Sequence, residues 1–285
     1  KALSVPSNTF IKVNGTIDFK TSGRFTIKGA KNICIQSADD DNRAKFIKTG
    51  NTDATNVINV VSDTETKTSS NNIVVRNIDF STNGNTKYYN SSYIYANNST
   101  NLAFSALHFE GNIKRVYSCS EIANSKFINN TVSNLSTPDN ESVMYISNAA
   151  KNSNNLISNF NLNNTSSTYG ISIMNSNDIT INNAQIDGNK KTVGIRISGS
   201  TDVTANPDMA VYSGTTISNS TIKNCSGRGI LISGAVKNIN ISKTGILNTV
   251  PDENNKDEQF GIKFVPNYIQ TKEVDGKDVP TSMYG

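Results

Sequence analysis

One five-residue motif, which we call the repeated phrase, recurs along the second half of this chain. It limits the possible folds more than any other feature. In each copy, a glycine is followed by apolar residues at alternate positions. The copies are Tyr-Gly-Ile-Ser-Ile at 169–173, Val-Gly-Ile-Arg-Ile at 193–197, Arg-Gly-Ile-Leu-Ile at 228–232 and Phe-Gly-Ile-Lys-Phe at 260–264. Apolar residues at every second position indicate strands that bury one face.

The spacing of the copies indicates a solenoid. The glycines lie at 170, 194, 229 and 261, so successive copies are 24, 35 and 32 residues apart. A minimum period that absorbs insertions is typical of stacked repeats. Helical repeats would need an apolar period of 3.6, leucine-rich repeats need leucines at fixed spacing, and a propeller blade needs four antiparallel strands. The pattern therefore predicts an all-β fold, a parallel β-helix.

The composition fits a thin core and argues against several kinds of partner. Only 35% of the 285 residues are hydrophobic, but they are periodic, so each coil can bury a narrow aliphatic stripe. The net charge is +4, and the basic residues are dispersed rather than gathered in the stripe that nucleic-acid binding favours. No apolar run approaches the roughly 18 residues of a membrane span. We therefore expect neither a nucleic-acid partner nor membrane insertion.

Cys34, Cys119 and Cys225 show no metal-ligand spacing and are predicted to be buried free thiols.

The start of the chain carries a second set of motifs. Pro-Ser-Asn-Thr at 6–9 leads into an apolar strand at 10–13, Gly-Thr-Ile follows at 15–17, and Asn-Ile-Cys-Ile lies at 32–35. This order resembles the first coils of the pectin-lyase-like superfamily, which includes polysaccharide lyases, hydrolases and epimerases and phage tailspikes. The resemblance implies a right-handed, single-stranded parallel β-helix of about 8 to 10 coils with loop insertions.

The resemblance also implies a partner and a location. It implies a polysaccharide partner and a protein that is extracellular, on a cell surface or on a virion. Members usually begin with a capping helix, which this sequence lacks. Because an uncapped solenoid end must be covered, we expect residues 1–285 to be a single β-helix domain from a longer chain.

Polar segments between the strand phrases predict loops and corners. Longer insertions are expected at 81–92, 134–142, 205–216, 249–259 and 270–282, and loops on one flank of a solenoid are where binding sites are built. Asparagines follow the predicted third strand of each coil, and stacking in register would make them an amide ladder at one corner. They are Asn83, Asn112, Asn130, Asn164, Asn189, Asn224 and Asn248.

Alternation within the first strand of each coil predicts which side chains face outward. Aligning the coils gives a column of Asn59, Tyr95, Tyr117, Tyr145, Ser172, Arg196, Leu231 and Lys263. Tyrosine rings can stack on the apolar face of a sugar, and Arg or Lys can pair with a uronate. We predict Tyr145, Arg196 and Lys263 as catalytic residues, and Tyr95, Tyr117, Arg228 and Glu141 as substrate-binding residues. The alternative is that stacked tyrosines only cover the sheet.

Two functions of different classes remain open. The first is an enzyme that cleaves or modifies an acidic polysaccharide, either as a lyase through the column or as a hydrolase through two carboxylates. The candidate carboxylates are many, and most are expected to be ordinary solvated charges: Asp39, Asp40, Asp41, Asp53, Glu110, Glu121, Asp139, Glu141, Asp187 and Asp208. Asn51-Thr-Asp and Asp39-Asp40 occur in the reverse of the polygalacturonase order and without Gly-His-Gly, and the lone His108 has no acidic neighbour in sequence. The second is a non-catalytic adhesin or receptor-binding spike, which as a spike would be a homotrimer. No cofactor is expected, and calcium among the acidic loops is left open.

Overall fold

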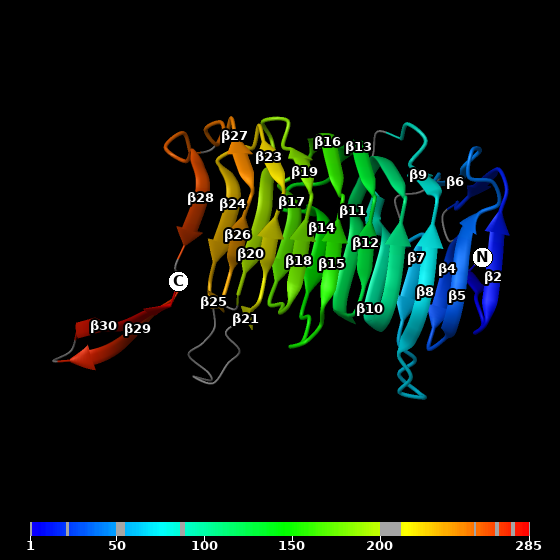
Figure 1. The fold of residues 1–285 in the computed structure, drawn as a ribbon, viewed down its shortest axis with the longest axis horizontal. Helices are drawn as coiled ribbons and strands as arrows, with labels where there is room; N and C mark the ends of the chain where they lie inside the picture. Colours follow the sequence, from blue (N-terminus) through cyan, green and yellow to red (C-terminus); the bar gives the residue numbers. More distant parts are fainter. Residues whose placement is uncertain are drawn as a thin grey trace.

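The computed structural model describes residues 2–20, 23–49, 55–85, 89–199, 212–253, 255–265, 268–274 and 277–284. Within these ranges every regular element is a strand, and 26 of the strands form one sheet (Figure 1). The strands stack side by side along the long axis of the molecule and pair in parallel. A sheet of this kind, wound around one core, is the predicted parallel β-helix.

The first strand of every turn stacks on the first strand of the turn before. These strands are β1 (Ala2–Ser4), β4 (Arg24–Lys28), β7 (Ile58–Val61), β10 (Tyr89–Ser105), β11 (His108–Ala123), β14 (Ser142–Ser147), β17 (Tyr169–Met174), β20 (Val193–Ser198), β24 (Arg228–Ser233) and β28 (Phe260–Val265). The long strands β10 and β11 run through corners, so each also contributes to a neighbouring column. We call the outward surface of this column the first-strand face.

Two further columns close each turn. The second column contains part of β10 together with β2 (Thr9–Val13), β5 (Lys31–Ser37), β8 (Ser70–Arg76), β12 (Lys126–Ile128), β15 (Asn155–Ser158), β18 (Ile179–Asn182), β22 (Thr216–Ser218) and β26 (Asn240–Ser242). The third contains part of β11 together with β3 (Thr16–Asp18), β6 (Ala44–Ile47), β9 (Ile78–Ser81), β13 (Thr131–Ser136), β16 (Asn161–Ser166), β19 (Gln185–Asp187), β23 (Thr221–Lys223) and β27 (Gly245–Leu247). The described chain thus makes nine three-stranded turns and then β28, which agrees with the predicted 8 to 10 coils.

The core is a narrow stack of inward side chains. Ile171, Ile195 and Ile230 are cross-strand partners on successive turns, and each is fully buried. Phenylalanines fill the N-terminal half, where Phe80 and Phe109 stack with ring centroids 4.9 Å apart. Because each turn buries only a few apolar residues, a low hydrophobic content is enough for this fold.

Tyr117 belongs to this core, so its predicted outward placement is wrong. Its side chain is fully buried, and its ring packs edge-on against Phe109 at 5.2 Å and Phe127 at 5.0 Å between centroids. Ser118 faces outward in its place, as the cross-strand partner of Tyr95 and Tyr145. The aromatic pocket decides the register here, since burying a tyrosine ring gains more than burying a serine.

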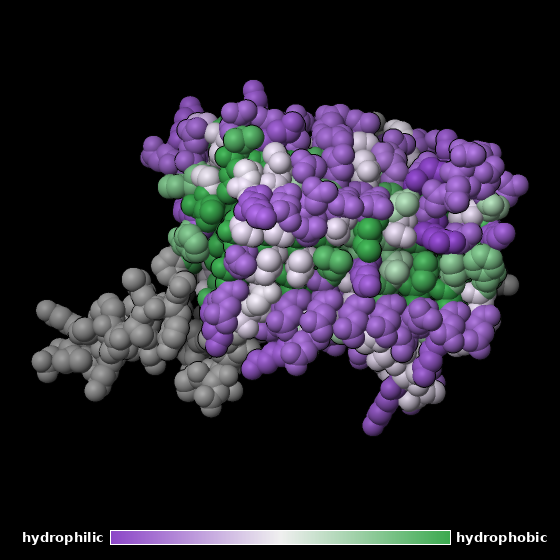
Figure 2. Space-filling model, in the orientation of Figure 1, coloured by the Kyte–Doolittle hydropathy of each residue, from purple (hydrophilic) through white to green (hydrophobic). Residues whose placement is uncertain are grey.

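The turns bend at corners that adopt the left-handed backbone conformation. At the corner before the second strand, the residues with positive φ include Asn8, Asn32, Asn72, Asn101, Asn124, Asn154, Asp178, Gly214 and Asn238. At the corner after it they include Asn77, Ala106, Asn129, Asn159, Asn183, Asn219 and Lys243. Asparagine tolerates this conformation better than other side-chain-bearing residues. The corners therefore explain much of the asparagine in the sequence. In Figure 2, hydrophilic residues accordingly form bands along the molecule on either side of a less polar strip.

Asparagine ladders exist, but mostly not at the predicted positions. Of the seven predicted asparagines, only Asn164 donates a side-chain hydrogen bond to another asparagine side chain, that of Asn134, among the residues described. Asn130 is instead buried and donates to the carbonyl of Phe104. The ladders lie at the two left-handed corners and consist of hydrogen bonds of 2.7–2.9 Å between side-chain amides. One ladder joins Asn8, Asn32 and Asn72, and the other joins Asn129, Asn159 and Asn183.

Outside the main sheet lie two small ones. β21 (Tyr212–Ser213) pairs with β25 (Val236–Lys237), and β29 (Tyr268–Val274) pairs with β30 (Lys277–Tyr284) in an antiparallel hairpin. Figure 1 places the hairpin beyond β28 at the C-terminal end, so the predicted loop at 270–282 is wrong. Residues 205–211 of another predicted loop lie outside the described residues. The single domain over 1–285 stays a prediction. No helix in the described ranges has the length and apolarity to cross a bilayer.

Candidate functional site

The central row of the first-strand face is in the predicted order, apart from Tyr117. Cross-strand partners place Tyr95, Ser118, Tyr145, Ser172, Arg196, Leu231 and Lys263 one after another along the axis. Asn59 precedes Tyr95 in the same row. Parallel strands keep partners on the same side of the sheet, so these side chains share one surface.

Tyr145 and Glu141, predicted separately, are brought together by an arginine that sequence reasoning missed. The guanidinium of Arg115 lies 4.2 Å from the ring centroid of Tyr145. Its Nε donates to Oε2 of Glu141 at 2.7 Å, and Lys114 Nζ lies 3.4 Å from Oε1. The side chains of Arg115 and Glu141 are 21% and 16% exposed. Partial burial strengthens such a pair relative to a fully solvated one, so the cluster holds Tyr145 in place.

Arg196 occupies the middle of the row and has a different environment. Its guanidinium lies 5.0 Å from the ring centroid of Tyr169, which comes from the preceding turn. Among the residues described, no carboxylate lies within ion-pair distance of Arg196. Its Nε is buried and has no hydrogen-bond partner. No carboxylate of the described residues therefore compensates the charge of Arg196, and the exposed part of its guanidinium can pair with an anion from outside.

Arg228 and Lys263 meet at a second carboxylate that was also missed. Glu258, from the loop before β28, forms ion pairs with Arg228 and, at 2.5 Å, with Lys263 Nζ. Lys263 Nζ also lies 5.1 Å from the ring centroid of Phe260. Lys263 carries three donors, so the ion pair with Glu258 leaves it able to donate further.

The charged groups of these three clusters leave the face positive. Lys114, Arg115, Arg196, Arg228 and Lys263 contribute five positive charges, and Glu141 and Glu258 contribute two negative ones, a difference of +3. A positive surface with aromatic rings attracts anions that also have an apolar face.

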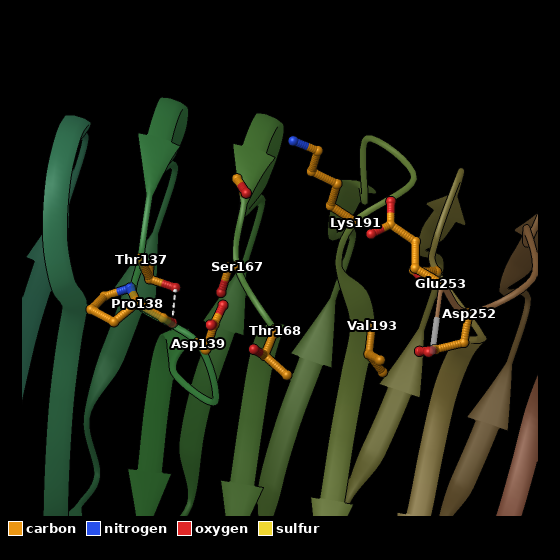
Figure 3. A pocket seen from close by; sticks show the side chains of 11 residues that line it. Thr137, Pro138, Asp139, Ser167, Thr168, Lys191, Val193, Asp252 and Glu253 are labelled. Carbon is orange, nitrogen blue, oxygen red and sulfur yellow. Dashed lines mark hydrogen bonds between the residues drawn. The ribbon is translucent and has the colours of Figure 1, made fainter. Parts of the chain in front are cut away.

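A polar groove borders this face where the loops from the third strand enter the first (Figure 3). It has a volume of about 340 Å³ and spans the predicted loops at 134–142 and 249–259. Asp139 lies on one of these loops, Asp252 and Glu253 lie on the other, and the side chain of Lys191 extends from the turn between them in Figure 3. Hydroxyl groups such as that of Thr168 line its floor. The groove thus has the opposite charge to the adjoining face.

His108 faces outward from the third column, as predicted. Its Nε2 lies 3.3 Å from Ser133 Oγ, and its cross-strand partner is Asp79. The Asp79 carboxylate instead accepts from Arg43 Nε at 2.6 Å. Among the residues that the structure describes, the serine and histidine therefore have no third group to orient them as a catalytic pair.

A metal site and the reactivity of the cysteines are the remaining chemistry to consider. In the described portion of the chain, no group of three or more His, Cys, Asp or Glu side chains could hold a metal ion. Burial raises the pKa of the Cys225 thiol to about 12 and that of Cys119 further, so both are inert small hydrophobes, while Cys34 is only half-buried.

The repeat period would have found two missed residues of the face, Tyr169 and Arg115. Tyr169 occupies the position just before the glycine of the repeated phrase, as does the predicted Arg228, and the cross-strand register places both beside the central row. Arg115 and Glu141 are 26 residues apart, close to one turn. Residues one repeat period apart are neighbours in a solenoid, so a search at that offset would have paired them.

The winding of three parallel columns around one core makes this chain a right-handed parallel β-helix, and the prediction of that fold is confirmed. The fold is similar to that of the Streptococcus pneumoniae surface protein and adhesin PfbA, with a TM-score of 0.53 and 13% identity over 92% of this chain and 68% of that one. The A-module of Azotobacter vinelandii mannuronan C-5 epimerase AlgE6 is more distant, with a TM-score of 0.36 and 8% identity over 93% and 91% of the two chains. For the catalytic domain of a GH87 α-1,3-glucanase, the TM-score is 0.37 at 13% identity over 92% and 63%. No protein-family model and no curated protein sequence matches the chain.

Proposed function

We propose that this protein is an extracellular β-helix that binds an acidic polysaccharide along its first-strand face. The observation that carries the proposal is the in-register row of Tyr95, Tyr145, Arg196 and Lys263 on a surface with a charge of +3. Tyrosine rings suit the apolar face of a pyranose, and the cations suit its carboxylates. The similarity of fold to a bacterial surface adhesin is in keeping with this role and location.

Binding without cleavage suits this face better than lyase chemistry. A lyase needs a base that is free to remove a proton from the sugar. Of the predicted catalytic residues, Lys263 is ion-paired with Glu258, and the guanidinium of Arg115 lies over the ring of Tyr145. These contacts fix the side chains as a binding surface.

A second candidate function belongs to the acidic groove. Carboxylates from two loops, Asp139 on one and Asp252 and Glu253 on the other, line a hollow of about 340 Å³. Glycoside hydrolysis uses two carboxylates that flank the scissile bond. The groove is therefore where a hydrolase activity would be located.

The two functions are separated by binding and turnover assays on one panel of acidic and neutral polysaccharides. Affinity is measured by calorimetry, lyase products by ultraviolet absorbance, and hydrolysis by reducing ends. Arg196→Ala should weaken binding of an acidic polymer about tenfold, since it removes the arginine without an internal carboxylate partner. Arg76→Ala, on the outward side of the second column, is the matched control and should bind like the wild type.

The results have distinct meanings. Equal affinities of the Arg196 and Arg76 variants, or no affinity for any acidic polymer, would refute the proposed binding face. Reducing ends that disappear in Asp139→Asn would establish the hydrolase candidate. Repeating the assay with a chelator tests whether calcium, which the sequence leaves open, takes part in binding, and sedimentation equilibrium tests for the trimer expected of a receptor-binding spike.

A further inference from the structure

From Tyr95 to Lys263, the central row of the first-strand face alternates between large side chains and side chains that are small or buried. Tyr95, Tyr145, Arg196 and Lys263 are partly exposed, and each is large. The rungs between them carry Ser118, which is small, and Ser172 and Leu231, which are 1% and 8% exposed. Contacts with a ligand along this row therefore come from every second turn.

The spacing of these four residues follows from the register. Each is two cross-strand steps from the next, and the pairings from Tyr95 to Lys263 contain no register shift. Neighbouring strands lie about 4.8 Å apart, so the four side chains are spaced by about 10 Å. We call them the four anchors.

This spacing suits one kind of ligand. In an extended β-1,4-linked polysaccharide, each sugar advances the chain by about one strand spacing, and neighbouring rings are flipped. Alternate sugars therefore present the same face to a surface beneath them. A chain that lay across the strands would meet only one anchor, whereas a chain parallel to the axis meets all four.

We infer that the first-strand face recognises a linear, extended acidic polysaccharide at every second sugar, with sugar rings on Tyr95 and Tyr145 and sugar carboxylates at Arg196 and Lys263. This inference rests on the proposed binding function and defines its ligand class further. Four anchors two sugars apart span seven sugars. A heptasaccharide is thus the shortest ligand that reaches them all.

The test is calorimetry with β-1,4-linked oligoglucuronates of one to eight sugars. Affinity should rise about two- to tenfold when the third, fifth and seventh sugars are added, because each completes a contact with another anchor. The fourth, sixth and eighth sugars should change it little. Cello-oligosaccharides share the backbone but lack the carboxylate, so they should lose the steps that depend on Arg196 and Lys263.

A variant provides an independent readout. Tyr145→Ser should weaken heptasaccharide binding by the same two- to tenfold and leave trisaccharide binding unchanged, since a trisaccharide can still contact Arg196 and Lys263. An affinity that rises smoothly with every added sugar, or equal losses for both lengths in Tyr145→Ser, would overturn the two-sugar inference while leaving the binding function intact. An absence of binding at every length, together with no binding of any acidic polymer, would overturn both.

Discussion

Replacing the glycine of the repeated phrase is predicted to destabilise the fold wherever another turn stacks on it. Gly194 stacks between Gly170 and Gly229 on neighbouring turns. A Cβ atom at Gly194 would lie 2.5 Å from the carbonyl oxygen of Gly229, 2.5 Å from Cγ2 of Ile222 and 3.1 Å from Sγ of Cys225. One of these neighbours is backbone and cannot rotate away, so the strands themselves would have to move apart.

The size of the effect follows from these contacts. Overpacking a close-packed site usually costs about 1–3 kcal/mol, and a clash with backbone belongs near the upper end. Replacing glycine also reduces the entropy of the unfolded chain, which returns about 0.4–1 kcal/mol. Gly194→Ala should therefore destabilise the fold by about 2 kcal/mol.

The chain offers a matched control in the last copy of the same phrase. A Cβ atom at Gly261 would have a single neighbour, Cγ2 of Ile246 at 3.9 Å, which is ordinary contact. Gly261→Ala should therefore leave stability unchanged or raise it slightly. The two substitutions are chemically identical, and among the described residues another turn packs over Gly194 but none packs over Gly261.

Urea unfolding followed by far-ultraviolet circular dichroism measures the difference. A solenoid need not unfold in two states, so the comparison uses the midpoint of the transition that each variant shifts. The Gly194→Ala midpoint should fall clearly below that of Gly261→Ala. Coincident midpoints would refute the argument that stacking between turns, rather than backbone freedom, requires the glycine.

Three further outcomes are expected. Tyr117→Phe should raise the free energy of unfolding by about 1 kcal/mol with glycan binding unchanged, because the buried hydroxyl has no hydrogen-bond partner; a lower urea midpoint would contradict this. Asn159→Ala should lower the free energy of unfolding by about 1–2 kcal/mol, since alanine resists the left-handed conformation, and Asn159→Gly should lower it less. Equal urea midpoints for the two variants would instead attribute the loss to the broken side-chain hydrogen bonds of the asparagine ladder. Burial raises the pKa of the Cys225 thiol to about 12, above the ordinary value of 9.0, so the unfolded chain ionises first and stability should fall as the pH rises between these values. The urea midpoint should therefore drop more between about pH 8 and pH 10 in the wild type than in Cys225→Ser. The same drop in both proteins would contradict this prediction.

The fold and most of the outward row could be predicted because alternation is a local property. Wherever a strand contained the phrase Gly-Ile-x-Ile, the two isoleucines fixed which side faced the core, and Ser172, Arg196 and Leu231 were placed correctly. Tyr117 was misplaced because its strand lacks the phrase. The sequence Val-Tyr-Ser-Cys alternates acceptably in either register. The ring contacts that decide between them come from Phe104 on β10, Phe127 on β12 and Phe109 at the far end of β11, in the third column.

The candidate site could be predicted only in part, because its partners are a full turn apart. Tyr145 and Glu141 were chosen for their chemistry, but the arginine that joins them precedes Glu141 by 26 residues. Glu258 lies in a loop whose course no periodicity specifies. The same is true of the groove, where Asp139 lies at one end and Asp252 and Glu253 at the other, on loops that no periodicity specifies (Figure 3).

The left-handed corners separate what this chain must keep from what it can change. A turn needs a residue that accepts positive φ at each bend and an apolar side chain at every second position between bends, and few other positions are constrained by the fold. Outward side chains and loops can therefore vary almost independently of the scaffold. The outward surface of such a chain can thus be rebuilt residue by residue while the corners and the inner apolar stripe keep the backbone unchanged.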